Sequence, residues 1–389
     1  MSAPLALIAA WARSPVAPVG GALSGLQAHE IAAPVVQALL VRAGLNAQAV
    51  DAIVLGNALG AGGNPARMLA LASGLPVRCA AYSLDTQCCS GLDAMTLAVG
   101  LLASGQAEVV IAGGVEAWSR APIRQVRPRH AHELPQTYEQ PPFAPDPAQD
   151  PDVLVSAADY ACASAISRTQ QDAYAVLSHQ RALAFEMDLS DELVGVASCR
   201  QDAYPRHLDA ARAARMPVAL KGVGHAHGQA VDCSVSRLAI SSKADGAALV
   251  LLATPQACQQ LGLTPRAAWV VGTSVGGDSR TPLLVAEQAA RSALHRARVS
   301  NLAEMQVVEL HDAFAVQGVS FCQAFGLDPL AINRRGGGLA RGHPIAASGT
   351  IAMVRVLSDL CRDHGPGARG LAAVAGAGGI GAAAIVSRL

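Results

Sequence analysis

Cys88 is the residue of this chain whose type and surroundings best suit nucleophilic chemistry. It lies within residues 85–92 (DTQCCSGL), where an extended segment passes into a helix that begins with small residues. The N-terminus of a helix offers free backbone N–H groups and the positive end of a dipole, which lower the pKa of a thiol and stabilise an oxyanion. We therefore expect Cys88 to be a nucleophile. The alternative is a small buried cysteine, the commoner fate of a single cysteine in an α/β core.

His343 is the candidate base for this thiol. It stands in a glycine-rich loop just before a predicted helix, within residues 336–349 (GGGLARGHPIAASG). A neutral imidazole there can accept the thiol proton or donate a hydrogen bond to a thioester oxygen, and Pro344 restricts the backbone beside it. The alternative is a structural turn that carries a solvated histidine.

His311 is a third candidate, in residues 309–315 (ELHDAFA), where the end of a strand enters a helix. We expect this histidine at the seam between two domains. The alternative is that Asp312 caps the helix and that His311 is incidental.

The remaining motifs predict no metal site. His130 with His132, and His225 with His227, lack the Cys or carboxylate neighbours that would complete one. Residues 376–381 (GAGGIG) are rich in glycine, but no βαβ unit follows them, so they do not predict dinucleotide binding either.

The composition describes the protein that must position these residues. The 389 residues are 51% apolar but only 3% aromatic, which favours layered α/β packing of Ala, Val and Leu and a pocket walled by aliphatic side chains. The 29 basic residues balance the 29 acidic ones, so no long-range field favours nucleic acid or an anionic membrane. Nine cysteines without CxxC pairs indicate a reducing cytoplasm. Residues 5–11 resemble a first strand rather than a signal peptide, and residues 370–386 a strand-turn-strand rather than a membrane span.

The chain contains a degenerate internal repeat. A helix over residues 29–43 leads into a strand over 50–55, and a helix over 286–297 leads into a strand over 307–310. Predicted helices over 92–103 and 350–360 each precede a further strand, over 108–114 and 371–376 respectively. Apolar strands that alternate with helices predict two mostly parallel sheets packed together, with the chemistry between the halves.

Residues 118–243 are richer in Pro, Arg, His, Asp and Gln than the flanking sequence, which indicates an inserted segment. Residues 124–152 are rich in proline and charge, and residues 169–186 have helical spacing behind a capping Ser167. We expect this insert to serve in binding rather than in the core; an ordinary surface excursion is the alternative.

Together these segments resemble the thiolases, in order along nearly the whole chain. The resemblance rests on short motifs that precede, contain and follow Cys88. They are residues 13–15 (RSP) with 20–21 (GG), 56–57 (GN) with 64–67 (NPAR), 88–92 (CCSGL), 112–116 (AGGVE) with 119–122 (SRAP), and 167–168 (SR) with 171–172 (QD) and 178–182 (SHQRA).

The resemblance implies an α/β thiolase fold of two duplicated βαβ-type halves in five α-β-α-β-α layers, with an inserted loop domain. The implied boundaries are 1–117 for the first part of the N-terminal half, 118–243 for the loop domain, 244–265 for the completion of that half, and 266–389 for the C-terminal half. It also implies a homodimer or homotetramer that acts on acyl-CoA in lipid metabolism, with the coenzyme A thioester as substrate and no bound cofactor.

The family's functional positions fall on residues already singled out and on two others. Cys88 matches the acylated nucleophile, and His343 matches the histidine that activates it. The backbone N–H groups of Cys88 and Ala377 match the donors of an oxyanion hole, and Ser241 matches a serine that lines the pantetheine channel.

Three positions depart from the family pattern. Residues 311–314 are His-Asp-Ala-Phe instead of Asn-Glu-Ala-Phe, a variant similar to sterol-carrier-type thiolases in which the histidine can still donate a hydrogen bond. The second catalytic cysteine is replaced by Ala375, and the alternative cysteine of some relatives, just after the His-Asp pair, is absent because Ala313 and Phe314 stand there. The His-Met pair that contacts CoA in biosynthetic thiolases is absent, since Val153 and Leu154 stand near its position.

Three hypotheses follow for the function. The first is an acyl-CoA C-acyltransferase of the acetyl-CoA acetyltransferase or 3-ketoacyl-CoA thiolase type, in which another group replaces the missing acid/base. The second is a decarboxylating condensing enzyme with a triad of Cys88, His311 and His343, which needs no base at carbon. The third is an acyltransferase subunit that depends on a protein partner.

Overall fold

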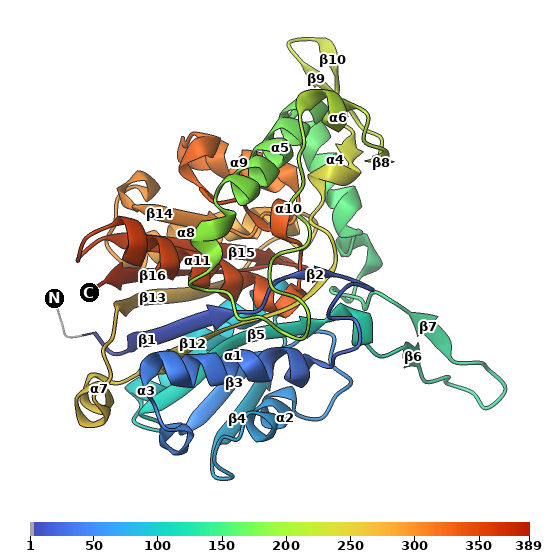
Figure 1. Ribbon diagram of the computed structural model, residues 1–389. Helices are drawn as coiled ribbons and strands as arrows, with labels where there is room; N and C mark the ends of the chain where they lie inside the picture. Colours follow the sequence, from blue (N-terminus) through green and yellow to red (C-terminus); the bar gives the residue numbers. More distant parts are fainter. Residues whose placement is uncertain (1–3) are drawn as a thin grey trace.

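The centre of the protein is a ten-stranded mixed sheet, seen in a computed structural model that describes residues 4–389 (Figure 1). Its strands are largely apolar and buried, and all ten positions of the central β12 are inaccessible to solvent. The order is β14-β15-β16-β13-β1-β12-β5-β3-β4, with β2 paired to β12. The strand bounds are β1 Leu7–Arg13, β2 Ala17–Pro18, β3 Ala52–Gly56, β4 Ala80–Leu84, β5 Val109–Ala117, β12 Ala244–Ala253, β13 Ala267–Gly276, β14 Val307–Leu310, β15 Arg369–Gly376 and β16 Ile380–Arg388.

The expectation of two separate, mostly parallel sheets is wrong. Only β3 with β4, β3 with β5, and β14 with β15 run parallel, whereas all other neighbouring strands in this sheet are antiparallel. The halves join where β1 pairs with β13 over Leu7 and Ile8. Strands buried on both faces carry no alternation that reveals their direction, so the apolar runs could not predict this. The strand-turn-strand expected over residues 370–386 is confirmed as the hairpin of β15 and β16.

The helices complete five layers. α3 (Ser90–Ala103) and α11 (Ser348–Asp363) form the middle layer, because each contacts strands of both halves. α1 (Ala28–Ala43) and α2 (Pro65–Ala72) cover the outer face of the first half, and α8 (Val285–Arg296) covers that of the second. This α-β-α-β-α arrangement confirms the predicted fold class. The remaining helices of this framework are α7 Pro255–Leu261, α9 Ala315–Phe325 and α10 Gly338–Arg341.

The segment between β5 and β12 lies on one side of this framework, and its β6–β7 hairpin projects outward (Figure 1). α5 begins directly after Ser167, whose side chain accepts from the backbone N–H of Gln170 in a capping box. The expected N-cap is therefore confirmed, and it fixes the start of the helix. The elements of this segment are β6 Arg124–Val126, β7 Gln136–Tyr138, α4 Val153–Ala163, α5 Arg168–Ala184, α6 Ala210–Ala214, β8 Val218–Leu220, β9 Val223–Ala226, β10 Gln229–Asp232 and β11 Val235–Ser236.

A network of buried ion pairs connects β1, the inserted segment and α11. Arg13 on β1 pairs with Glu192 at 2.6 Å and with Asp202 at 2.7 Å. Glu192 also pairs with Arg355 on α11, which in turn pairs with Asp359. The side chains of Arg13, Glu192 and Arg355 are fully inaccessible to solvent, so each charge depends on its partners for compensation.

All nine cysteines are free thiols. Among residues 4–389, no helix combines the length and the apolar character that crossing a membrane requires.

Candidate active site

Cys88 lies in a strained turn at the start of α3. Gln87, which precedes it, has φ of 52°, a left-handed conformation that side chains other than glycine rarely adopt. The Ser90 hydroxyl holds the turn, because it donates to the Gln87 carbonyl at 2.6 Å and accepts from the Thr86 backbone N–H at 2.9 Å. A Cβ at Gly56 would lie 2.6 Å from the Ser90 Cβ, so this position must be glycine for β3 to approach the turn.

His343 comes from the other half and meets the thiol. Its Nε2 lies 3.1 Å from Cys88 Sγ, and its backbone N–H donates to the Ser242 carbonyl at 2.7 Å. Its Nδ1 lies 2.9 Å from the Ser348 hydroxyl, which is also 3.1 Å from the Pro344 carbonyl. Since a carbonyl only accepts, Ser348 donates to Pro344 and accepts from Nδ1–H. These two hydrogen bonds assign the proton to Nδ1 of His343, so the lone pair on Nε2 faces the thiol.

Both members of the pair are neutral at rest. Burial raises the pKa of the Cys88 thiol to about 12, against the backbone N–H groups of Ala377 and of Cys88 itself, which lower it. Burial also lowers the pKa of His343 to about 4. The pKa of this thiol was expected to be lowered, but its net direction is upward, because the cost of removing a thiolate from water outweighs the two backbone N–H groups.

The two backbone donors expected to form an oxyanion hole lie together beside this sulfur. The N–H groups of Ala377 and Cys88 both interact with Cys88 Sγ. Ala377 follows β15 and precedes Gly378 and Gly379, whose φ values of 81° and 76° let the chain turn back into β16. These donors can stabilise negative charge on the sulfur or on an oxygen attached next to it.

His311 stacks against His343 and does not reach the pocket wall. The ring centroids are 4.4 Å apart and the planes differ by 20°. Burial, His343 and Arg341 hold the pKa of His311 well below its ordinary value, so its ring is neutral. Within residues 4–389 its buried Nε2 has no hydrogen-bond partner. The alternative that Asp312 caps the following helix is wrong, because α9 begins at Ala315 with Phe314 as its N-cap.

A cavity of about 340 Å³ opens onto the thiol between the two halves and the inserted segment. Cys88, His343, Ser241, Ala375 and Ala377 line it, and the Ser241 hydroxyl donates to the Gly338 carbonyl at 2.7 Å. Ala375 and Ala313 both face this cavity, and an alanine side chain at either position cannot donate or accept a proton. Of the two positions at which the family's CoA-contacting His-Met pair is replaced, Val153 lines the cavity and Leu154 does not.

The walls of this cavity are more aromatic than the composition predicted. Trp118, Phe143 and Phe314 line it beside aliphatic residues such as Val153 and Ile240, so the expected aliphatic wall is present together with three aromatic side chains. Three of the 13 Trp, Tyr and Phe residues of the chain are thus placed where they can contact a ligand. Lys243 lies 4.5 Å from the centroid of the Trp118 ring and also pairs with Glu139 at the same wall.

Sequence reasoning missed Glu116, which connects the loop after β3, residues 57–59, to the loop that carries His343. This buried carboxylate accepts from Asn57 Nδ2 at 2.9 Å and from the backbone N–H groups of Leu59 at 3.1 Å and Ala346 at 3.2 Å. Burial raises its pKa to about 7 despite these donors. A carboxylate at the end of an apolar strand was the available signal. It was missed because the role lies in bridging two loops that are distant in sequence.

The histidine pairs expected to be incidental stay outside this site. His130 and His132 stack on each other at 5.8 Å in an exposed loop, and His225 and His227 belong to the β9–β10 hairpin. Among residues 4–389, no group of three or more His, Cys, Asp or Glu is placed to hold a metal ion.

Comparison with known proteins gives consistent matches over both halves. Residues 6–256 match the model of the thiolase N-terminal domain, and residues 263–388 match that of the thiolase C-terminal domain. An acetyl-CoA acetyltransferase of Rhizobium meliloti is 33% identical over 408 residues, covering 100% of both chains, and one of Thiocystis violacea is 33% identical, covering 97% of each. The crystal structure of the Bacillus anthracis acetyl-CoA acetyltransferase superposes with a TM-score of 0.87 at 28% identity, covering 99% of this chain and 98% of that one.

Proposed function

This chain belongs to the thiolase family and is an acyltransferase, and on that premise we propose that it transfers the acyl group of an acyl-CoA thioester through Cys88. The relatives that match over their full length are named as acetyl-CoA acetyltransferases. This favours reaction of the acetyl-CoA acetyltransferase or 3-ketoacyl-CoA thiolase type over a decarboxylating or partner-dependent one.

The observation that carries the proposal is the neutral pair of Cys88 Sγ and His343 Nε2, 3.1 Å apart at the wall of a cavity. In the first half-reaction Sγ attacks the thioester carbonyl carbon while its proton passes to Nε2. The carbon–sulfur bond to coenzyme A then breaks, and the leaving thiolate takes the proton back from the imidazolium. The enzyme carries an acyl thioester, and free coenzyme A leaves.

The backbone N–H groups of Cys88 and Ala377 are suited to bind the carbonyl oxygen during this attack, since both already interact with Sγ. Ser348 is a positioning residue that holds His343 in the tautomer with a free Nε2. The unpaired Nε2 of His311 lies behind the cavity wall and is suited to donate to a water that bridges to the thioester oxygen, because a buried polar atom without a partner is costly.

The second half-reaction lacks one group in this chain. Condensation requires removal of a proton from the α-carbon of a second acyl-CoA, and the alanine methyl at position 375 cannot do this. We therefore propose that acylation of Cys88 is efficient, whereas carbon–carbon bond formation or thiolysis is slower by roughly 10²- to 10⁴-fold than with a positioned acid/base.

Intact-mass measurement after incubation with acetyl-CoA tests the proposal. We expect one acetyl group on the wild type, none on Cys88→Ala, and one on Cys89→Ala, because Cys89 is a buried neighbour outside the cavity. A chase of the acetyl-enzyme with acetyl-CoA or malonyl-CoA then identifies the acceptor. Absence of an acyl adduct on the wild type, or an adduct that persists in Cys88→Ala, contradicts the proposal.

A further inference from the structure

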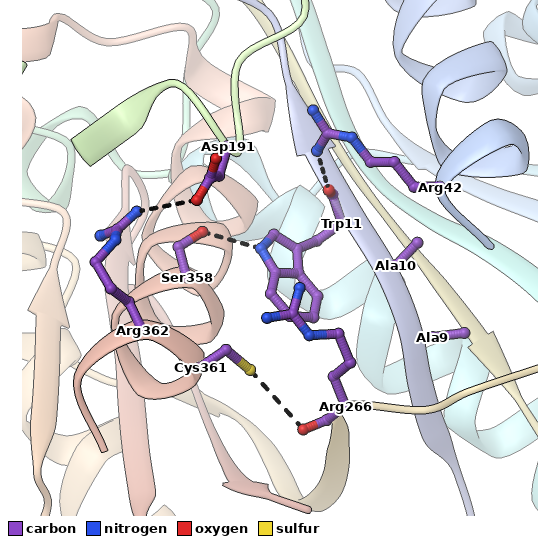
Figure 2. Close-up of a pocket in the computed structure, with 9 residues that line it drawn as sticks. All are labelled: Ala9, Ala10, Trp11, Arg42, Asp191, Arg266, Ser358, Cys361 and Arg362. Atoms are coloured by element: carbon purple, nitrogen blue, oxygen red, sulfur yellow. Dashed lines mark hydrogen bonds and ion pairs between the residues drawn. The ribbon is translucent and has the colours of Figure 1, made fainter. Parts of the chain in front are cut away.

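A second cavity, of about 440 Å³, lies at the seam between the halves and shares no lining residue with the catalytic cavity (Figure 2). Its walls come from the middle of β1, the end of α1, Asp191 of the inserted segment, the residue before β13 and the last turns of α11. The lining residues are Ala9, Ala10, Trp11, Arg42, Asp191, Arg266, Ser358, Cys361 and Arg362. Three guanidinium groups thus face one carboxylate, in a chain whose total charge is balanced.

Arg266 carries the charge that is least compensated. Its guanidinium carbon lies 4.9 Å from the centroid of the Trp11 ring, and Trp11 is itself anchored by its Nε1, which donates to Ser358 Oγ at 2.9 Å. In the part of the chain that the structure describes, no carboxylate lies within ion-pair distance of Arg266. Stacking on a fixed indole orients the guanidinium, so little side-chain entropy would be lost on binding an anion.

Arg42 adds a second guanidinium that forms no ion pair with a carboxylate of the described residues. Its guanidinium donates to the Trp11 carbonyl at 2.6 Å and to the Leu193 carbonyl at 3.3 Å, both of which are neutral. Burial lowers the pKa of Arg42, against the opposing effect of Glu192 and Asp191. Figure 2 shows its guanidinium at one end of the Trp11 residue and that of Arg266 over the ring.

Arg362 is better compensated than the other two. It lies 3.9 Å from Asp191, whose side chain is 85% exposed, and 3.4 Å from Asp359, a carboxylate shared with the buried ion network. The excess positive charge therefore rests mainly on Arg42 and Arg266.

We propose that this cavity binds a small metabolite that carries a phosphate or carboxylate group, at a site separate from acyl transfer. The planar guanidinium of Arg266 and that of Arg42 would donate to the oxyanion, because paired N–H groups match the geometry of both anion classes. The volume corresponds to that of a small-molecule site and exceeds what a bare ion needs, and the apolar wall of Ala9 and Ala10 can contact the carbon portion of such a ligand.

The cavity supplies its own reporter for a binding experiment. Trp11 is one of three tryptophans, and the variant Trp118→Phe with Trp269→Phe leaves it as the sole indole. Titration of this variant with pyrophosphate and, separately, with citrate distinguishes the phosphate class from the carboxylate class. We expect a saturable change in Trp11 fluorescence with one of them, and calorimetry on the wild type should give the same dissociation constant.

The variants then locate the site. Arg266→Gln should weaken binding roughly ten- to hundredfold, as should Arg42→Gln, because each removes charge-assisted hydrogen bonds. Arg266→Lys keeps the charge but loses the planar fork, so binding should still weaken. Arg291→Gln is the matched control, since Arg291 also stacks on an aromatic ring, that of Phe325 at 4.5 Å, outside the cavity. It should bind as the wild type does.

Two results would overturn the proposal. One is the absence of saturable binding of either probe at millimolar concentration in the folded wild type. The other is binding that Arg266→Gln and Arg42→Gln leave unchanged, which would place the anion outside this cavity. Protection of Cys361 from alkylation by the bound probe, followed by peptide mass mapping, gives a second readout that does not depend on fluorescence.

Discussion

Cys88 and His343 are 255 positions apart in the chain, yet their side chains form a contact of 3.1 Å in which neither partner is charged. A neutral pair differs chemically from a thiolate–imidazolium pair, because the thiol loses its proton only as it attacks. The pH dependence of acylation distinguishes the two.

The rate of Cys88 acylation should be nearly independent of pH between about 5 and 9. His343 is required in its neutral form, and burial lowers its pKa to about 4, so protonation inhibits only near that value. The thiol, with a pKa of about 12, gives no increase at alkaline pH in this range. Rapid-quench mass measurement of acyl-enzyme formation checks this. A limb with an apparent pKa of 6 to 7 would show that His343 titrates as a solvated histidine.

Ser348→Ala should slow acylation about 10- to 100-fold with little change in the affinity for acyl-CoA. Without the hydroxyl, Nδ1–H loses its acceptor and the tautomer with a proton on Nε2 competes. The comparison is Thr350→Val, two residues along the same helix, whose hydroxyl has no partner within the described residues. Equal losses in both variants would mean that Ser348 acts only through packing. Recovery in Ser348→Thr supports the hydrogen bond.

Ala375→Cys should raise the rate of thiolysis of a 3-ketoacyl-CoA by roughly 10²- to 10⁴-fold and leave acylation of Cys88 unchanged. The new thiol would face the cavity at the position where an acid/base is missing. Ala313→Cys places a thiol at another point of the same wall and gives the matched comparison. If neither cysteine increases the rate, another group in the wild type already moves this proton.

Glu192→Gln should lower the free energy of unfolding by about 3–5 kcal/mol, because it leaves the buried guanidinium groups of Arg13 and Arg355 short of a partner. The neighbouring Asp191→Asn, at an exposed side chain, should change it little. Urea unfolding measures both. A loss for Glu192→Gln no larger than that for Asp191→Asn would show that water reaches the network.

Three buried carboxylates, those of Glu192, Glu116 and Glu309, make the stability of the protein depend on pH. Burial alone would raise the pKa of Glu192, but Arg355 and Arg13 outweigh it and hold the pKa at about 2. Its contribution is therefore full above the unfolded value of about 4.5 and is lost as pH falls toward 2. Burial raises the pKa of both Glu116 and Glu309 to about 7, so their effect has the opposite sign: stability falls as pH rises from about 4.5 to 7. Burial lowers the pKa of His343 and His311, and these groups make stability rise over the same range, so the contribution of Glu116 is measured as the difference in the pH dependence of the melting temperature between the wild type and Glu116→Gln. A pH dependence that the variant leaves unchanged would contradict this.

Local features were predictable from the sequence where the physical cause is local. The capping box at Ser167, the hairpin of β15 and β16, and the helix that begins just after Cys88 each follow from neighbouring residue types. The antiparallel pairing at the centre of the sheet could not be predicted, because the sequence of a fully buried strand such as β12 does not show its direction.

The environment of the Cys88 thiol could be described only from the three-dimensional structure. The pairing of Cys88 with His343 was predicted through the family resemblance, whereas the direction of the thiol pKa depends on burial, which no short motif encodes. The arginine-lined cavity was invisible for a similar reason, since Arg42, Arg266 and Arg362 belong to segments that only the tertiary structure brings together.

The division of the reaction centre between two halves has a consequence for assembly. The halves are connected through α7, and Gly262, with φ of 66°, marks an exposed turn between the two family domains. A backbone cut at Gly262 would leave the thiol on one fragment and the imidazole on the other. Only fragments that reassociate would bring the two groups together and form the acyl-enzyme. The amount of acyl-enzyme would therefore measure how well the two halves bind each other.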